Sequence, residues 1–130
     1  MEEIFYVPDQ QESPSVRKHF LEMSGYKVVQ FASGAEVLEA LEARTPALVL
    51  LDVLIEGANG FDVCRTIRNR RPAAEFPIVL TSGVYHSRLY RDEALAAGAQ
   101  SYVIRPIDPD DLVKIVNEVL AAYAAPVPAD

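Results

Sequence analysis

One compact domain is expected for this chain, because 130 residues, 50% of them hydrophobic and 24% charged, can build one core but hardly two. The net charge of −7, from 12 Lys and Arg against 19 Asp and Glu, excludes the basic surface that direct nucleic-acid binding needs. The single cysteine, Cys64, excludes an internal disulfide, and neither a signal peptide nor an apolar run of about 20 residues occurs. We therefore expect a cytoplasmic protein that does not bind membranes.

Strand and helix patterns alternate along the whole chain. Short runs rich in apolar, β-branched or aromatic residues predict five strands, at residues 4–7, 27–31, 47–51, 78–80 and 101–104. Helical spacing and capping signals predict five helices, at residues 14–24, 34–45, 61–71, 87–97 and 109–123. Residues 124–130 contain two prolines and little to bury, so we expect a domain over 1–123 and then a tail or the start of a linker.

The first helix has the clearest start and stop signals. Ser13 is the predicted N-cap ahead of a proline at the first helical position, and Gly25 is the expected left-handed terminator. Val16, Phe20 and Met23 recur at helical spacing, which predicts that they form the buried face of this helix.

Residues 47–51 are apolar without alternation, the pattern of a central parallel strand that helices cover on both faces. Five strands that alternate with five helices imply right-handed crossovers. The expected fold class is therefore α/β, a doubly wound five-stranded parallel sheet in a three-layer sandwich. In such sheets the ligand crevice lies at the carboxyl ends of the strands.

Four polar residues fall at or just after predicted strand ends: Asp9, Asp52, Ser82 and Arg105. Two converging carboxylates suit a hard cation such as Mg²⁺, and a carboxylate beside a cation can attack phosphorus. A hydroxyl and a guanidinium suit the oxygens of a phosphoryl group. The structural alternative is that such residues only cap helices and satisfy loop amides.

The order of these residues resembles the response-regulator receiver family over about residues 4–123. The resemblance is carried by Asp52 with Gly60 eight positions on, by Asp9 ahead of Gly25-Tyr26, and by the last strand and turn at residues 101–106. It implies the flavodoxin-like receiver fold of two-component signalling proteins, which matches the alternation above.

The resemblance also implies roles for individual residues. Asp52 would be the phosphoacceptor, Asp9 and the backbone carbonyl of Leu54 would join it as Mg²⁺ ligands, and Arg105 would contact the phosphoryl group. Ser82 would be the switch hydroxyl.

The resemblance implies roles for two further residues, which lie in the last strand and in the turn after it. Tyr102 would be the aromatic switch, and Pro106 would follow a cis peptide bond. Tyr102 could equally be an ordinary strand residue that packs in the core.

Three positions depart from the family pattern. Pro8 replaces the first acid of an adjacent pair, Arg105 replaces a lysine, and Glu56 replaces a proline in the loop after Asp52. The missing negative charge predicts a weakened magnesium site. Leu54 and Val84 are apolar at the two positions that tune aspartyl-phosphate hydrolysis in the family, which predicts a long-lived phosphoryl adduct.

Three classes of function compete. The first is a phosphorelay switch, which is not an enzyme in its own right: a histidine kinase or phosphotransfer protein donates to Asp52, and the last helix-strand-helix face then binds an effector or a second copy. The second is a pseudo-receiver that binds a partner without phosphorylation. A flavodoxin-like cofactor carrier is disfavoured, because residues 8–13 contain two acids and no glycine to cradle a phosphate.

Overall fold

A parallel five-stranded sheet forms the centre of the molecule. The structure, a computed structural model, describes residues 2–11 and 13–124. The sheet has the strand order β2-β1-β3-β6-β7, and all four pairings are parallel. Its strands are β1 (Glu3–Val7), β2 (Lys27–Gln30), β3 (Leu48–Asp52), β6 (Ile78–Ser82) and β7 (Ser101–Ile104).

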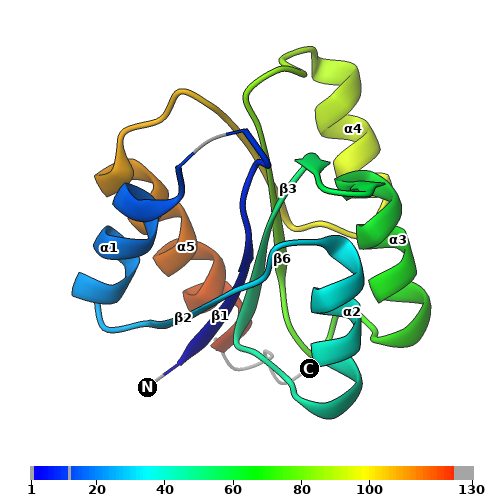
Figure 1. Cartoon of the computed structure of the whole chain (residues 1–130), viewed down its shortest axis with the longest axis horizontal. Coiled ribbons are helices and arrows are strands. Elements are labelled where there is room, and N and C mark those ends of the chain that lie inside the picture. The colour runs from blue at the N-terminus through cyan, green and yellow to red at the C-terminus, as the bar shows by residue number, and fades with distance from the viewer. Residues whose placement is uncertain (1, 12, 125–130) are drawn as a thin grey trace, which may run out of the picture.

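Five helices complete the other two layers (Figure 1). α1 and α5 cover one face of the sheet, and α2, α3 and α4 cover the other. The helices are α1 (Ser15–Met23), α2 (Gly34–Ala43), α3 (Gly60–Arg70), α4 (Arg88–Ala96) and α5 (Pro109–Ala124). The predicted fold class is confirmed, because the order of the elements and the parallel pairing are those expected from the alternation.

The sheet separates two hydrophobic cores. Along β3, Leu48 and Leu50 pack with α1 and α5, whereas Val49 and Leu51 pack with α2, α3 and α4. Successive side chains of a strand point to opposite faces, so a strand buried on both sides must be apolar at every position. The unbroken apolar run before Asp52 thus places that residue at the end of the central strand.

Several predicted helix ends are confirmed in detail. The Ser33 hydroxyl accepts from the backbone N–H of Glu36 at 3.2 Å, as the capping pattern predicts. Gly25 and Gly98, which follow α1 and α4, have φ values of +97° and +103°, in the region that favours glycine. The cis peptide bond between Arg105 and Pro106 is present as well.

The predicted start and buried face of α1 are wrong. Pro14, not Ser13, occupies the N-cap position, and no side-chain hydrogen bond caps this end. Val16 and Met23 are 57% and 72% exposed, and the fully buried residue is Leu21. At about 100° per residue, Val16 and Met23 lie roughly 140° and 160° around the axis from Leu21, so they face away from the core.

The segment after β3 was predicted to be a loop but forms a small antiparallel hairpin. Its strands are β4 (Leu54–Ile55) and β5 (Ala58–Asn59), and Gly57 takes a φ of +74° in the turn between them. The hairpin leads directly into α3, and the Asn59 side chain caps that helix by accepting from the N–H of Phe61 at 2.8 Å.

Candidate functional site

Asp52 lies at the carboxyl edge of the sheet, where the loops after β1, β3 and β6 converge at the top of Figure 1. It pairs in register with Thr81 of the neighbouring strand β6. Partner residues of parallel strands project to the same face, which brings the Thr81 hydroxyl to the carboxylate. Thr81 donates to Asp52 Oδ2 at 2.7 Å, and the N–H of Leu54 donates to Oδ1 at 2.9 Å.

Arg105 joins the two acids of the site. Its Nη2 lies 2.6 Å from Oδ2 of Asp52 and 3.1 Å from Oδ2 of Asp9. The side chains of Arg105, Asp52 and Asp9 are only 5%, 2% and 9% exposed, so these ion pairs are largely shielded from solvent. The cluster is thus assembled from the last residue of β3 and from residues that follow β1 and β7 by one or two positions.

The cluster shifts the ionisation of Asp52. Burial is the main cause and raises the pKa of the Asp52 carboxyl above its ordinary value, and the nearby Asp9 charge acts in the same direction. Hydrogen bonds from Thr81 and Leu54 and the charge of Arg105 oppose this rise. The carboxylate is therefore costly to bury, and its donors and counter-charge offset part of that cost.

The expected metal ligands lie together, but each has a partner. Asp9 Oδ2 and Asp52 Oδ2 both contact Arg105, and the Leu54 carbonyl accepts from the N–H of Gln10 at 3.1 Å. Two carboxylates and a carbonyl are the oxygen donors that Mg²⁺ prefers. No group of three or more His, Cys, Asp or Glu side chains able to hold a metal occurs within residues 2–11 and 13–124. The donor types fit Mg²⁺, but an ion bridging both acids would have to displace the guanidinium.

Ser82 and Tyr102 hold the loop after β6. The Ser82 hydroxyl oxygen accepts from the N–H groups of Val84 and Tyr85 at 3.1 and 2.9 Å. The Tyr102 hydroxyl donates to the Tyr85 carbonyl at 2.6 Å, and burial raises the pKa of this phenol. The two expected switch residues therefore meet at the segment that leads into α4, whereas Asp52 is contacted by Thr81.

A cavity of about 390 Å³ lies beside Arg105, and neither Asp52 nor Asp9 lines it. Arg17 of α1 lines it, with Gly83 and Pro106 among the other lining residues. Sequence reasoning missed Arg17 because its predicted helix face was wrong. It missed Thr81 because only the strand register pairs that residue with Asp52, although its position beside Ser82 at the end of β6 was a usable signal.

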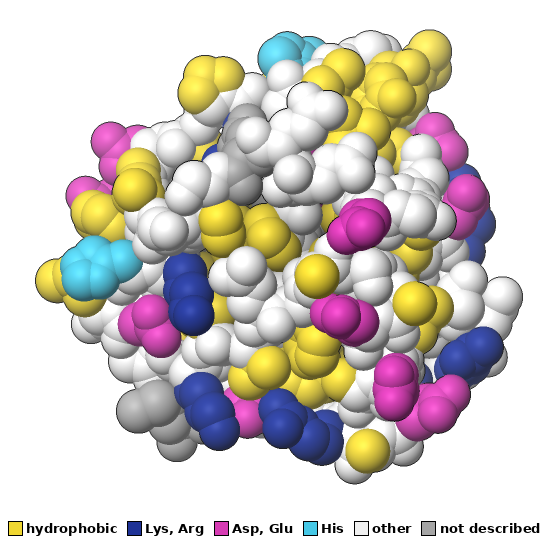
Figure 2. Space-filling model, in the orientation of Figure 1, with side chains coloured by type: hydrophobic (Ala, Val, Ile, Leu, Met, Phe, Trp, Pro, Cys, Tyr) yellow, Lys and Arg dark blue, Asp and Glu magenta, His cyan; other side chains and the backbone are white. Residues whose placement is uncertain are grey.

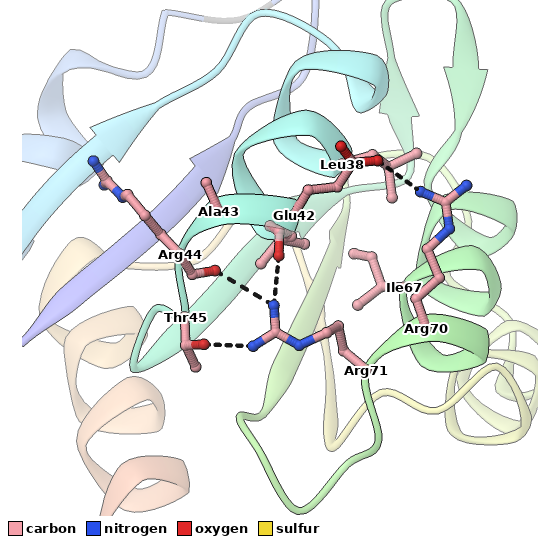
Figure 3. A pocket seen from close by; sticks show the side chains of 9 residues that line it. Leu38, Glu42, Ala43, Arg44, Thr45, Ile67, Arg70 and Arg71 are labelled. Carbon is pink, nitrogen blue, oxygen red and sulfur yellow. Dashed lines mark hydrogen bonds and ion pairs between the residues drawn. The ribbon is translucent and has the colours of Figure 1, made fainter.

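A second cavity, of about 370 Å³, lies between the carboxyl ends of α2 and α3 (Figure 3). Arg71 reaches across it and donates to the Leu41 carbonyl, to the Thr45 hydroxyl and, at 3.4 Å, to the Arg44 carbonyl. Arg71 thus satisfies carbonyls at the end of α2, which is a structural role. This cavity does not include Asp52 or any other member of the charged cluster.

The family model of the response regulator receiver domain matches residues 4–117. This chain belongs to the response regulator receiver family. Receiver domains are signalling domains of two-component systems and are generally not enzymes, and phosphorylation and Mg²⁺ binding are general features of the family.

Two curated relatives illustrate the sequence similarity. The phosphate regulon transcriptional regulatory protein PhoB of Rhizobium meliloti is 31% identical over 118 residues, which cover 90% of this chain and 51% of that protein. The DNA-binding transcriptional regulator NtrC of Escherichia coli K12 is 32% identical over 123 residues, 92% of this chain and 25% of that protein. The chain thus spans about half or less of the length of these relatives.

Solved structures show the same fold. A CheY-like receiver domain protein from Methanospirillum hungatei superposes with a TM-score of 0.84 at 27% identity, covering 95% of this chain and 96% of that one. A putative response regulator from Chloroflexus aurantiacus gives a TM-score of 0.83 at 27% identity, covering 92% and 98%. In the described part of this receiver domain, no helix is both long and apolar enough to cross a membrane.

Proposed function

We propose that this receiver domain accepts a phosphoryl group on Asp52 from a histidine kinase or a phosphotransfer protein. The observation that carries the proposal is the buried cluster at the carboxyl edge of the sheet, in which Arg105 contacts both Asp52 and Asp9. Such a cluster holds a carboxylate nucleophile beside a fixed cation, the arrangement that phosphoryl transfer needs.

In the proposed step, a carboxylate oxygen of Asp52 attacks the phosphorus of a phosphohistidine. The new O–P bond forms as the N–P bond breaks, and the imidazole leaves with the bonding electron pair and takes up a proton. Arg105 stabilises the negative charge on the phosphoryl oxygens, and Arg17, which lines the cavity beside Arg105, adds positive charge nearby.

Asp9, Asp52 and the Leu54 carbonyl are the groups that would hold Mg²⁺ in this chain, in competition with Arg105. When bound, the ion would neutralise charge on the phosphoryl group. The absence of a second acid at Pro8 predicts weaker binding than an acidic pair would give.

Ser82 and Tyr102 are the proposed relay from Asp52 to the surface. Both contact residues 84–85, which lead into α4, so a new contact of Ser82 with a phosphoryl oxygen would disturb that segment. The adjoining α4-β7-α5 face carries the exposed apolar residues Leu89, Leu95 and Ile104. We propose this face as the surface that binds an effector or a second copy.

The test is the intact mass of the protein after incubation with Mg²⁺ and phosphoramidate, whose P–N bond resembles that of phosphohistidine. We expect one phosphoryl group on the parent and on Asp62→Asn, whose side chain is 75% exposed on α3, but none on Asp52→Asn. The proposal would be overturned if folded parent gained no mass while a known receiver did so in parallel.

The second candidate is a pseudo-receiver that binds its partner without phosphorylation. It is favoured by one observation, that a guanidinium already pairs with both acids of a site in which Pro8 stands where the family has a further acid. Failure of the parent to gain mass would support it, and Pro8→Asp would then be the first variant to restore phosphorylation.

A further inference from the structure

A single nitrogen of Arg105 lies between the two carboxylates of the site. Nη2 contacts Oδ2 of Asp52 at 2.6 Å and Oδ2 of Asp9 at 3.1 Å. These are the two acids that a bridging divalent ion would use. The guanidinium therefore occupies the place, and supplies part of the charge, that a metal ion would otherwise provide.

The position of Arg105 is built into the fold. The residue is 4% exposed, and its backbone N–H donates to the Ser82 carbonyl at 2.8 Å. Its guanidinium lies against Gly83, where an added Cβ would approach Nη2 to 3.3 Å and the central carbon to 3.4 Å. The glycine thus leaves the room that the planar group occupies, a larger volume than an ammonium would need.

The charge of the cluster agrees with this placement. Among the residues that the structure describes, Asp9 and Asp52 bring two negative charges and Arg105 one positive charge, and position 8 holds a proline rather than a further acid. A divalent ion between the same oxygens would have to expel a buried, hydrogen-bonded cation and find it a new partner, which costs free energy.

We infer that Arg105 is the resident cation of this site and that phosphoryl transfer to Asp52 proceeds without a divalent metal. This inference rests on the proposed function only for its second half, since the occupation of the site by Arg105 can be tested by itself. In the transfer, the O–P bond to Asp52 forms, the N–P bond of the donor breaks, and Arg105 donates to the phosphoryl oxygens.

The first experiment measures Mg²⁺ binding. Its two readouts are the thermal unfolding midpoint and the amide chemical shifts around Asp52. Ligand binding to the native state raises the midpoint, so we expect no change for the parent up to about 10 mM Mg²⁺. Arg105→Gln is expected to gain Mg²⁺ binding at least about tenfold tighter than the parent, because the competing cation is removed. Arg91→Gln, the same change at an exposed position of α4, should behave as the parent does.

The second measurement is the rate of phosphorylation by phosphoramidate in EDTA and in Mg²⁺. The parent rate should agree within about twofold between the two conditions. In EDTA, Arg105→Gln should be slower by about 100-fold, the usual effect of removing one donor that stabilises transition-state charge. Mg²⁺ should restore part of that rate in Arg105→Gln, so the variant becomes metal-dependent where the parent is not.

The outcomes separate the two proposals. Tight Mg²⁺ binding by the parent, or phosphorylation that EDTA abolishes, would overturn the role of Arg105 while leaving Asp52 as the acceptor. No phosphorylation in either condition would overturn the proposed function, and the binding experiment would still decide whether Arg105 occupies the site. If Arg105→Gln fails to fold, Arg105→Lys serves in its place and should bind Mg²⁺ more tightly than the parent, because a compact ammonium reaches the two acids less well.

Discussion

Thr81 acts at the site through one hydrogen bond. Its hydroxyl donates to the buried Asp52 carboxylate at 2.7 Å. Thr81→Val keeps the shape but removes the donor, so we expect a loss of about 1–3 kcal/mol in the free energy of unfolding at neutral pH. Denaturant titration measures it, and Thr81→Ser, which keeps the hydroxyl, is the control. Equal midpoints for the parent and Thr81→Val would show that the bond contributes nothing.

Leu54 and Val84 stand at the two positions expected to govern loss of the phosphoryl group. Val84 is 57% exposed and Leu54 is half-buried, and neither side chain can hydrogen-bond an attacking water. We therefore expect Leu54→Asn and Val84→Glu each to shorten the lifetime of the aspartyl phosphate by about tenfold or more. The decay of the phosphorylated mass measures it, with Val84→Leu as the control that should leave the lifetime unchanged.

Cys64 should be inert in the native protein. The thiol is fully buried on α3, and burial raises its pKa to about 11. Between about pH 9 and pH 11 the thiol keeps its proton in the native state but loses it in the unfolded chain. The free energy of unfolding therefore falls as the pH rises through that range. At about pH 8, a disulfide reagent should modify the native thiol at least about 100-fold more slowly than the unfolded one. The reaction rate with and without denaturant checks this, and rapid modification of folded protein would contradict it.

Among the elements, the β4-β5 hairpin places the start of α3 against the end of β3. A Cβ on Gly60 would lie 2.4 Å from the Asp52 carbonyl oxygen and 2.7 Å from Val53 Cα, and both are backbone atoms that cannot turn aside. Gly60→Ala should therefore lower the free energy of unfolding by about 2–3 kcal/mol. Displacement of Asp52 should also slow its phosphorylation.

Gly57 of the same hairpin is the matched control. A Cβ there would meet nothing within 4 Å, although its φ of +74° is strained for alanine. Gly57→Ala should cost only about 1–2 kcal/mol. Denaturant midpoints of the two variants test the comparison, and equal losses would show that close backbone packing at Gly60 is unimportant.

For the whole molecule, the charge distribution opposes direct DNA binding even though one relative is named as a DNA-binding regulator. The net charge is −7, and on the face in Figure 2 the Lys and Arg side chains lie singly or in small groups near acidic ones, without a continuous basic strip. We expect no binding of a DNA duplex by this chain at about 50 mM salt, measured by fluorescence anisotropy. Binding that weakens steeply with added salt would contradict the prediction.

The sequence-based predictions agree best with the structure where short-range chemistry determines the local conformation. The Ser33 cap, the positive φ of Gly25 and the central strand that ends at Asp52 follow from short patterns, because caps, turns and two-sided burial each demand particular residue types. The buried face of α1 was wrong, because in a nine-residue helix several sets of apolar residues fit the spacing and only packing against α5 and the sheet selects Leu21.

By itself, the sequence determined the alternation of five strands and five helices, and through it the edge at which Asp9, Asp52, Ser82 and Arg105 gather. Their contacts were decided by the tertiary structure. The register of β3 and β6 gave Asp52 the Thr81 hydroxyl, and the ends of β1, β3 and β7 brought both acids to one nitrogen of Arg105. Such contacts join residues up to 96 positions apart, and no local pattern encodes a distance that only the packed sheet fixes.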